Sequence, residues 1–172
     1  MHDRGLFWTP APTRAQPQFS ARDVTIQIVS GLSQNLLSGP RPPGGGKLSG
    51  LKAPIGFSGV ALGPTYAVAI AADRSLIVSQ GQPPFSEGWD ATSATAVTNM
   101  DDAFLVMDIE GPGLNDLVSK ATTLDVSDAS PSASLFFAGF ACLAYRYERL
   151  DVLRLHIEWP LAAALGEWLR LA

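Results

Sequence analysis

The sequence predicts a single α+β domain, because strand-like and helix-like segments follow one another along a chain of 172 residues. Residues 23–30 alternate apolar and polar side chains, as a half-buried strand does. Residues 112–121 place apolar side chains three and four positions apart, which is typical of a helix. A chain of this length buries roughly 70% of its extended surface on folding, so one core is sufficient.

Residues 1–20 are predicted to form an extended, proline-rich arm. They contain three prolines and show no apolar periodicity, which is typical of a semi-rigid extended segment. Phe7 and Trp8 are unusual in such an arm. They either fold back on their own domain or bind another chain. The single α+β domain is then residues 21–172.

The first half of the domain is predicted to contain a strand, a helix and three further strands. After the strand at 23–30, residues 31–39 suit a short helix that ends at Gly39. Residues 40–54 form a loop by composition, since they are rich in proline and glycine. Three short apolar segments suit strands and lie at 57–62, 65–71 and 74–80. A break with one helical turn follows at 81–90.

The second half repeats this order and adds a closing helix. Residues 101–111 predict a strand, and residues 112–121 predict a helix whose first turn can hold Pro112. Three strand candidates and the closing helix follow at 132–139, 140–148, 151–158 and 160–171. We therefore expect a duplicated strand–helix–three-strand unit with ferredoxin-like βαβ elements.

Composition and charge argue against nucleic acid and membranes as partners. The formal charge is −4 and the pI is about 5.0, which disfavours binding to a polyanion. No apolar run has the length of a membrane-spanning helix, and the N-terminus has no apolar segment of the signal-peptide type. We therefore expect a cytoplasmic protein. A hydrophobic fraction of 47% favours either a well-filled core or an apolar surface kept for a partner.

The Gly-Pro-Gly segment at 111–113 stands between a predicted strand and a predicted helix, where many proteins bind a phosphate. A dinucleotide site needs a further glycine at the position of Asp116. We therefore interpret the segment as a turn in which Gly111 and Gly113 free the backbone and Pro112 fixes the start of the helix. If Gly113 takes a positive φ angle, a β-branched residue there would strain the backbone. Two other candidate motifs each lack a residue that their function requires. Leu48 replaces the Ser or Thr of a phosphate loop after "RPPGGGK", and Val60 replaces the last glycine of a nucleophile elbow in "GFSGV".

Histidine and cysteine are too rare for an ordinary metal site or a catalytic pair. The chain contains His2, His156 and a single cysteine, Cys142, whereas a structural zinc site needs about four such ligands. Cys142 stands among apolar strand residues and is expected to be a small core residue. We therefore expect no catalytic, cofactor-binding or metal-binding residue in this chain.

Two long segments of the second half carry a resemblance to a known family. They are "VTNMDDAFLVMDIEGPGLNDLVSKATTLDVS" and "SASLFFAGFACLAYRYERLDVLRLHIEWPLAAALGEWL", and "ALGP" at 61–64 precedes them. Their motifs are similar in order and spacing to those of the gamma subunit of heterotetrameric sarcosine oxidase. Beyond that family, they resemble the N-terminal part of the folate-binding fold of the aminomethyltransferase, or glycine cleavage T-protein, superfamily. The resemblance covers residues 57–172 and, less clearly, 23–40.

The resemblance implies a subunit that needs larger partners. In that family the larger subunits carry FAD, FMN, NAD and the tetrahydrofolate site, and the gamma subunit packs against them. Catalytic aminomethyltransferases have an acidic residue at the entry to the strand, where this chain has Thr98 and Asn99. Because asparagine is neither a general acid nor a general base, this departure weakens any folate chemistry by the chain alone.

We therefore expect a non-catalytic, gamma-type subunit of a sarcosine-oxidase-like complex, with larger flavoprotein subunits as partners. Phe7, Trp8 and Trp168 are the candidate interface residues, since large aromatic side chains often anchor interfaces. Two alternatives stay open from the sequence. One is a stand-alone folate-binding, aminomethyltransferase-like one-carbon enzyme, and the other is an unrelated binding module with the same layout.

Overall fold

The computed structural model describes residues 19–21, 23–39, 51, 53–125 and 130–172. Its elements, in chain order, are β1 (Phe19–Ala21), β2 (Val24–Val29), β3 (Leu32–Ser38), β4 (Val60–Ala61), β5 (Thr65–Ala71), β6 (Arg74–Gln80), β7 (Gly88–Asp90), β8 (Thr95–Asn99), β9 (Phe104–Glu110), α1 (Leu114–Ala121), β10 (Ser134–Phe137), β11 (Phe140–Tyr147), β12 (Arg149–Glu158), the 3₁₀ turn η2 (Trp159–Leu161) and α2 (Ala162–Leu171). No helix in this part of the chain is long and apolar enough to cross a membrane.

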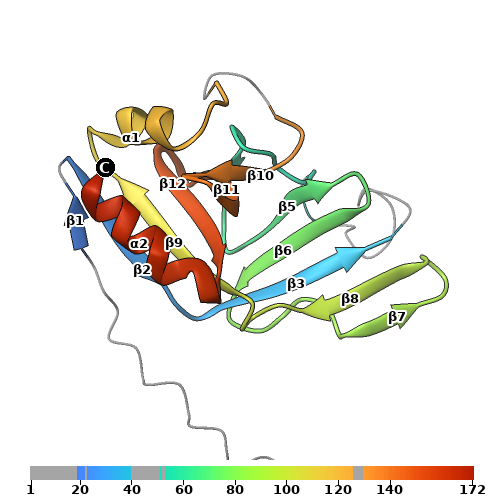
Figure 1. Cartoon of the computed structure of the whole chain (residues 1–172). Helices are drawn as coiled ribbons and strands as arrows, with labels where there is room; N and C mark the ends of the chain where they lie inside the picture. The colour runs from blue at the N-terminus through green and yellow to red at the C-terminus, as the bar shows by residue number, and fades with distance from the viewer. Residues whose placement is uncertain (1–18, 22, 40–50, 52, 126–129) are drawn as a thin grey trace, which may run out of the picture.

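The strands form two sheets that the chain connects directly. Sheet A has the strand order β1-β2-β9-β12-β11-β10, with β4 pairing parallel to β11. Sheet B has the order β5-β6-β3-β8-β7. The chain passes from sheet A to sheet B between β2 and β3, contributes β4 to sheet A between β3 and β5, and returns to sheet A between β8 and β9 (Figure 1). Strands far apart in the sequence therefore lie side by side in each sheet.

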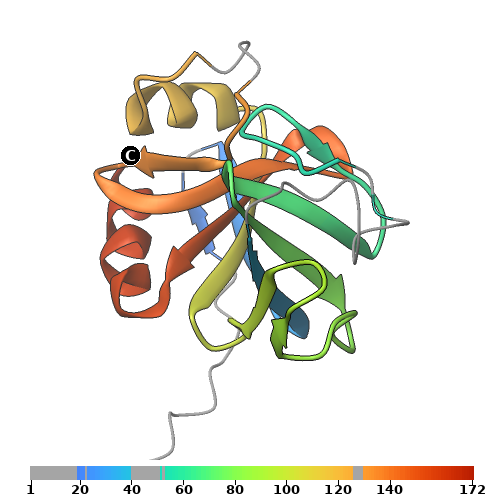
Figure 2. The same cartoon turned by 90° about the vertical axis from the view of Figure 1, so that its right-hand side faces the viewer.

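The two helices cover one face of sheet A, and sheet B lies against the other face. In Figure 2 both helices lie on the left and the green strands of sheet B on the right. On the helix side, Leu155, Ile157, Val118 and Leu165 are all 0% exposed and belong to one core cluster. Fully burying such a side chain stabilises the fold by about 1.5–3 kcal/mol. This cluster is the main apolar core.

Strand β12 contributes to both layers because its side chains alternate between the faces of sheet A. Leu153, Leu155 and Ile157 belong to the core under the helices. Arg154 and His156 instead form hydrogen bonds with residues of sheet B. β12 pairs with β9 on one side and with β11 on the other, so its backbone polar groups are satisfied although the strand is buried.

The predicted helix at 31–39 is wrong, because Leu32–Ser38 form strand β3. β3 pairs with β6 along its whole length and with β8 on its other side. An isolated short helix with Ser and Asn in it gains little free energy, whereas β6 pairs with all of β3 and β8 pairs with its residues 35–38. Tertiary pairing therefore overrides the local pattern. The duplicated strand–helix–three-strand unit is not confirmed, since its first copy has no helix among the described residues.

The ferredoxin-like βαβ arrangement is also wrong for the segment around α1. This helix connects β9 to β10, but β12 and β11 lie between these two strands. Each neighbouring pair in that order is antiparallel, so β9 and β10 run in opposite directions. A βαβ unit joins parallel strands instead. The α+β class itself is confirmed, with sheets that are mostly antiparallel.

The remaining predicted elements are present with shifted ends. The segments at 65–71 and 74–80 coincide with β5 and β6, and those of the second half correspond to β9, α1, β10, β11, β12 and α2. Of the strand predicted at 57–62, Val60–Ala61 are in β4, and the predicted break at 81–90 contains β7. β1 begins at Phe19, two residues before the predicted start of the domain.

The Gly-Pro-Gly turn depends on Gly111. This residue has a φ angle of +136°, whereas Gly113, the N-cap of α1, has a φ of −79°. Gly113 therefore does not meet the condition of a positive φ angle, and Gly111 is the glycine that the turn requires. Pro112 precedes the helix rather than lying in its first turn. A Cβ atom at Gly111 would lie 2.2 Å from the backbone oxygen of Asp23. The Gly113 N–H donates to that oxygen over 3.1 Å, so the turn fixes the start of α1 beside β2.

We predict that Gly111→Ala lowers the free energy of unfolding by at least about 1–3 kcal/mol, because the methyl group strains the backbone and overlaps the Asp23 carbonyl. Gly166→Ala in α2 is the matched control, since nothing lies within 4 Å of its added Cβ. There, alanine favours the helix by about 0.5–1 kcal/mol. Denaturant unfolding of both variants measures the difference. Equal stabilities would show that Gly111 is not constrained.

Candidate functional site

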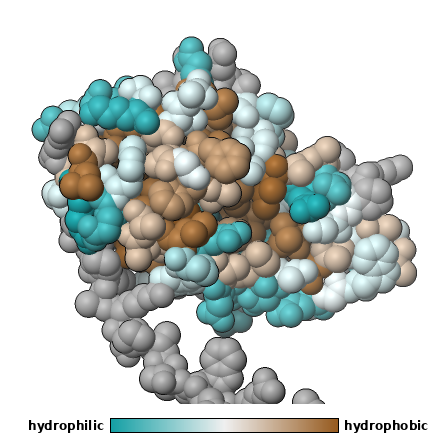
Figure 3. All heavy atoms as spheres, viewed as in Figure 1, coloured by the Kyte–Doolittle hydropathy of each residue, from teal (hydrophilic) through white to brown (hydrophobic). Residues whose placement is uncertain are grey.

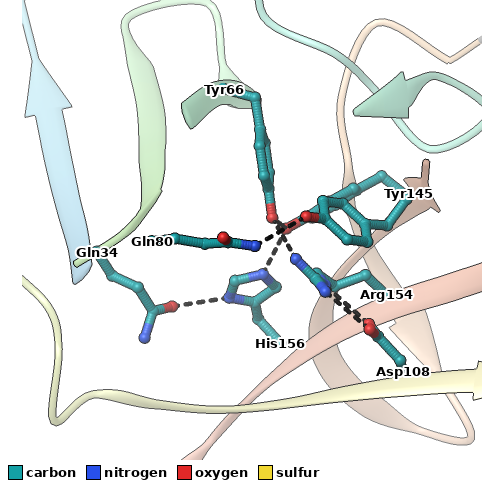
Figure 4. A network of polar contacts seen from close by, with 8 residues as sticks. Gln34, Tyr66, Gln80, Asp108, Tyr145, Arg154 and His156 are labelled. Atoms are coloured by element: carbon teal, nitrogen blue, oxygen red, sulfur yellow. Dashed lines mark hydrogen bonds and ion pairs between the residues drawn. The ribbon is translucent and has the colours of Figure 1, made fainter. Parts of the chain in front are cut away.

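A network of polar side chains lies between the two sheets, around Arg154 and His156 of β12 (Figure 4). Arg154 is 3% exposed and His156 is 0% exposed. The Arg154 guanidinium donates from Nε and Nη2 to the two carboxylate oxygens of Asp108, both over 2.7 Å. It also donates from Nη1 to the Tyr66 hydroxyl over 2.8 Å. Asp108 is the register partner of Arg154 on β9, so the sheet itself places the two charges together.

A chain of hydrogen bonds continues from Arg154 to Gln34 on β3 (Figure 4). The Tyr66 and Tyr145 hydroxyls are 3.0 Å apart, the Tyr145 hydroxyl is 2.7 Å from His156 Nε2, and His156 Nδ1 is 2.8 Å from Gln34 Oε1. The two ends fix the direction of donation, because a guanidinium donates only and an amide oxygen accepts only. His156 therefore carries its proton on Nδ1 and accepts from Tyr145 at Nε2.

Burial sets the protonation states of this network. Burial, and after it the charge of Arg154, lowers the pKa of His156 from 6.5 to about 3. Burial also raises the pKa of Tyr66 and holds the pKa of Tyr145 well above its ordinary value. Burial alone would lower the pKa of Arg154, but the hydrogen bonds and charge of Asp108 outweigh it and raise that pKa. At neutral pH the network therefore holds one ion pair, two neutral phenols and a neutral imidazole.

This network suits a structural connection between the sheets better than catalysis. His156 has no exposed surface, and both of its ring nitrogens have partners, so a substrate cannot reach it unless the sheets separate. Tyr66 and Gln34 belong to sheet B and the other members to sheet A. One feature of the sequence could have indicated this network, namely that Arg154 and His156 are polar residues within an otherwise apolar strand. No feature of the sequence indicated that Tyr66 and Gln34 take part in it.

A pocket of about 180 Å³ opens beside the network. It is lined by Thr25 and Gln27 of β2, Asp108 and Glu110 of β9, and Tyr147, Glu148, Arg149 and Val152 of the β11–β12 hairpin. The Tyr147 ring lies over the Arg154 guanidinium, whose carbon is 3.4 Å from the ring centroid. The Tyr147 hydroxyl accepts from Gln80 Nε2 over 3.3 Å. Pocket and network therefore share Asp108, and Tyr147 of the pocket stacks on Arg154 of the network.

The predicted interface residues lie away from this pocket. Phe7 and Trp8 are outside the described residues, so their role stays a prediction. Trp168 is half-buried against the apolar core, with its ring edge-on to Phe137 at 6.1 Å between centroids. Figure 3 shows that apolar residues gather on the face that includes α2. Part of the Trp168 ring thus belongs to its own core, and its contact with a partner also stays a prediction.

Asn99 and Cys142, two other residues noted in the sequence, both have contacts within the fold that explain them. Asn99 Oδ1 accepts from the Asp101 N–H over 2.8 Å, and Asn99 Nδ2 donates to the Asp101 carboxylate over 3.2 Å, so Asn99 orders the turn before β9. Cys142 is buried, and burial raises the pKa of its thiol to about 12. Within the described ranges, no group of three or more His, Cys, Asp or Glu side chains could hold a metal ion.

These observations define a class of fold: an α+β protein of two facing sheets, with helices on one side and a sealed polar network between the sheets. Among solved structures, the fold is similar to a chain of the heterotetrameric sarcosine oxidase from Corynebacterium sp. U-96, determined in complex with pyrrole 2-carboxylate. The TM-score is 0.69 at 17% sequence identity, and the likeness covers 89% of this chain and 85% of that chain.

The resemblance indicated by the sequence motifs is thus confirmed as a structural likeness to heterotetrameric sarcosine oxidase. No protein-family model and no curated protein matches the chain. At 17% identity the likeness establishes a shared fold, and a fold by itself does not specify a function.

We predict that Asp108→Ala lowers the free energy of unfolding by about 3–5 kcal/mol, because it leaves the buried Arg154 guanidinium without its counter-charge. Glu110→Ala is the matched control on the same strand. Glu110 pairs with Arg149 at the surface over 2.8 Å, and both side chains are at least half exposed, so its loss should cost less than about 1 kcal/mol. Chemical denaturation of both variants measures this difference. Similar losses would contradict a special role for the buried pair.

We predict that His156 makes the fold less stable in acid. Its folded pKa of about 3 lies below its ordinary value of 6.5, so the unfolded state binds the proton first as the pH falls. Stability is therefore full above pH 6.5 and falls between pH 6.5 and pH 3, by about 2–3 kcal/mol at about pH 4.5. His156→Gln should remove this part of the pH dependence. Unfolding curves at several pH values test it, and identical slopes in both proteins would refute it.

Proposed function

We propose that this chain is a non-catalytic, gamma-type subunit of a cytoplasmic sarcosine-oxidase-like complex. Such a complex would oxidatively demethylate sarcosine or a related N-methyl amine. The observation that carries the proposal is the structural likeness to a chain of heterotetrameric sarcosine oxidase over 89% of this chain. Because the likeness also covers 85% of the matched chain, the two chains are similar in length. Similar lengths are expected if both chains are small subunits of the same type.

The chemistry of the described residues supports a non-catalytic role. Among the described residues, the one histidine, His156, is sealed between the sheets and neutral, and the carboxylate of Asp108 is paired with Arg154. Asn99, at the position where aminomethyltransferases carry an acid, binds its own chain at Asp101. We propose that FAD, FMN, NAD and tetrahydrofolate bind to the larger subunits, with one-carbon transfer to tetrahydrofolate occurring there.

The proposal predicts that the full-length tagged chain, purified under native conditions from its source cells, retains larger subunits that contain flavin. The chain produced alone should have no visible flavin absorbance and no oxidase activity on sarcosine. Mass spectrometry of the retained subunits and the absorbance of both preparations test these expectations. The matched control is the same tag on a chain unfolded by Asp108→Ala, or on an unrelated small protein if that variant stays folded.

Two results would contradict the proposal. One is a chain that remains alone although its larger subunits are present in the extract. The other is stoichiometric tetrahydrofolate bound to the isolated chain together with aminomethyltransferase activity, which would support the stand-alone one-carbon enzyme instead.

A further inference from the structure

The turn of the β11–β12 hairpin is held in an unfavourable backbone conformation. Glu148 has a φ angle of +57°, which a residue other than glycine rarely adopts. Two hydrogen bonds hold it there. The Glu148 N–H donates to the Ala61 carbonyl over 2.8 Å, and the Gly63 N–H donates to Glu148 Oε1 over 2.8 Å. The hairpin is therefore rigidly attached to the segment around β4. Strained positions that are kept in place in this way are often functional.

This rigid region exposes two leucines to solvent. Leu150, beside the turn, is 73% exposed, and Leu62, between Ala61 and Gly63, is 48% exposed. Leu150 lies in the β11–β12 hairpin and Leu62 in the segment after β4, and the hydrogen bonds of Glu148 join these two segments. Exposed leucines contribute nothing to the core of their own domain. An exposed apolar pair on a hydrogen-bonded backbone is suited to binding, because less conformational entropy is lost when it is ordered at an interface.

The pocket beside Leu150 is acidic and has free hydrogen-bonding groups. Three of its lining residues are carboxylates and one is a guanidinium, so negative charge exceeds positive charge even when Arg154 beneath Asp108 is counted. Thr25 and Gln27 line the pocket from β2, and their side chains form no hydrogen bond with the described part of the chain. A cation with several donors would therefore find both charge complementarity and acceptors there.

We propose that Leu62, Leu150 and this pocket form a docking surface for a larger subunit of the complex, with the pocket receiving a lysine or arginine side chain of that partner. The inference rests on the proposed function, because it assigns the surface on which the proposed assembly depends. A side chain of the partner suits the site better than a small molecule. The volume of about 180 Å³ is below the roughly 300–1,000 Å³ of typical ligand pockets, and a small ligand would leave both leucines exposed.

The test measures the affinity of the full-length immobilised chain for the purified larger subunits. Leu150→Asp should weaken binding at least about tenfold, since it replaces an exposed leucine of the proposed contact with a charged side chain. Phe136→Asp is the matched control, because Phe136 is 71% exposed on β10 and pairs at the start of β11, away from the hairpin. It should stay within about twofold of wild type, and circular dichroism of each variant verifies folding.

The charge of the pocket is tested separately at Gln27. Gln27→Lys should weaken binding at least about tenfold and reduce its salt dependence, whereas Gln27→Glu should bind at least as tightly as wild type. Gln82→Lys, at an exposed position outside the pocket, should leave the affinity unchanged. Opposite effects of Lys and Glu at one position separate charge from shape.

The outcomes distinguish this inference from the proposed function. If the wild-type chain does not bind the larger subunits, both fail. If it binds, and Leu150→Asp and Gln27→Lys bind equally well, the docking surface is wrong while the proposed function stands. If those variants bind normally, and methylammonium perturbs the amide resonances of Thr25 and Gln27 in the free chain, the pocket is a small-amine site. That result would also overturn the inference.

Discussion

The ion pair between Asp108 and Arg154 is the interaction on which the arrangement of the two sheets depends. A buried guanidinium is costly unless acceptors surround it, and here Asp108 supplies two of them and Tyr66 a third. Because Tyr66 belongs to sheet B, satisfying Arg154 requires both sheets to be in place. The same guanidinium lies under the Tyr147 ring that borders the pocket, so the buried network and the surface beside the hairpin are physically coupled.

The burial of this network keeps most of its polar side chains, including His156, away from solvent and from substrates. A polar network in a low-dielectric interior is stable only when every member has its partners. Burial, and after it the charge of Arg154, keeps His156 neutral, and the same burial keeps it out of reach of a substrate. The described residues also present several exposed features at the surface. The hairpin with Leu150, its acidic pocket, and the apolar face that includes α2 (Figure 3) are suited to contact with other chains. This division agrees with a subunit whose partners carry out the chemistry.

Segments with a single clear period could be predicted from the sequence, as β9, α1, β11, β12 and α2 show. The segment at 31–39 could not, because its spacing of leucines and polar residues is compatible with either period, and β6 and β8 decide between them. The glycine turn gives a second example. Two glycines were visible, but only the contact with Asp23, far away in the sequence, determines that Gly111 has the positive φ angle.

Composition, periodicity and motif spacing are properties of the amino-acid chain, so the α+β class, the scarcity of metal ligands and the resemblance to heterotetrameric sarcosine oxidase could be inferred from them. Long-range pairing instead establishes which sheet each strand joins and which polar residues meet. The network is built from Gln34, Tyr66, Asp108, Tyr145, Arg154 and His156, which come from five strands. Their hydrogen bonds need positions accurate to a few tenths of an ångström, and such positions exist only after strand order and register are fixed.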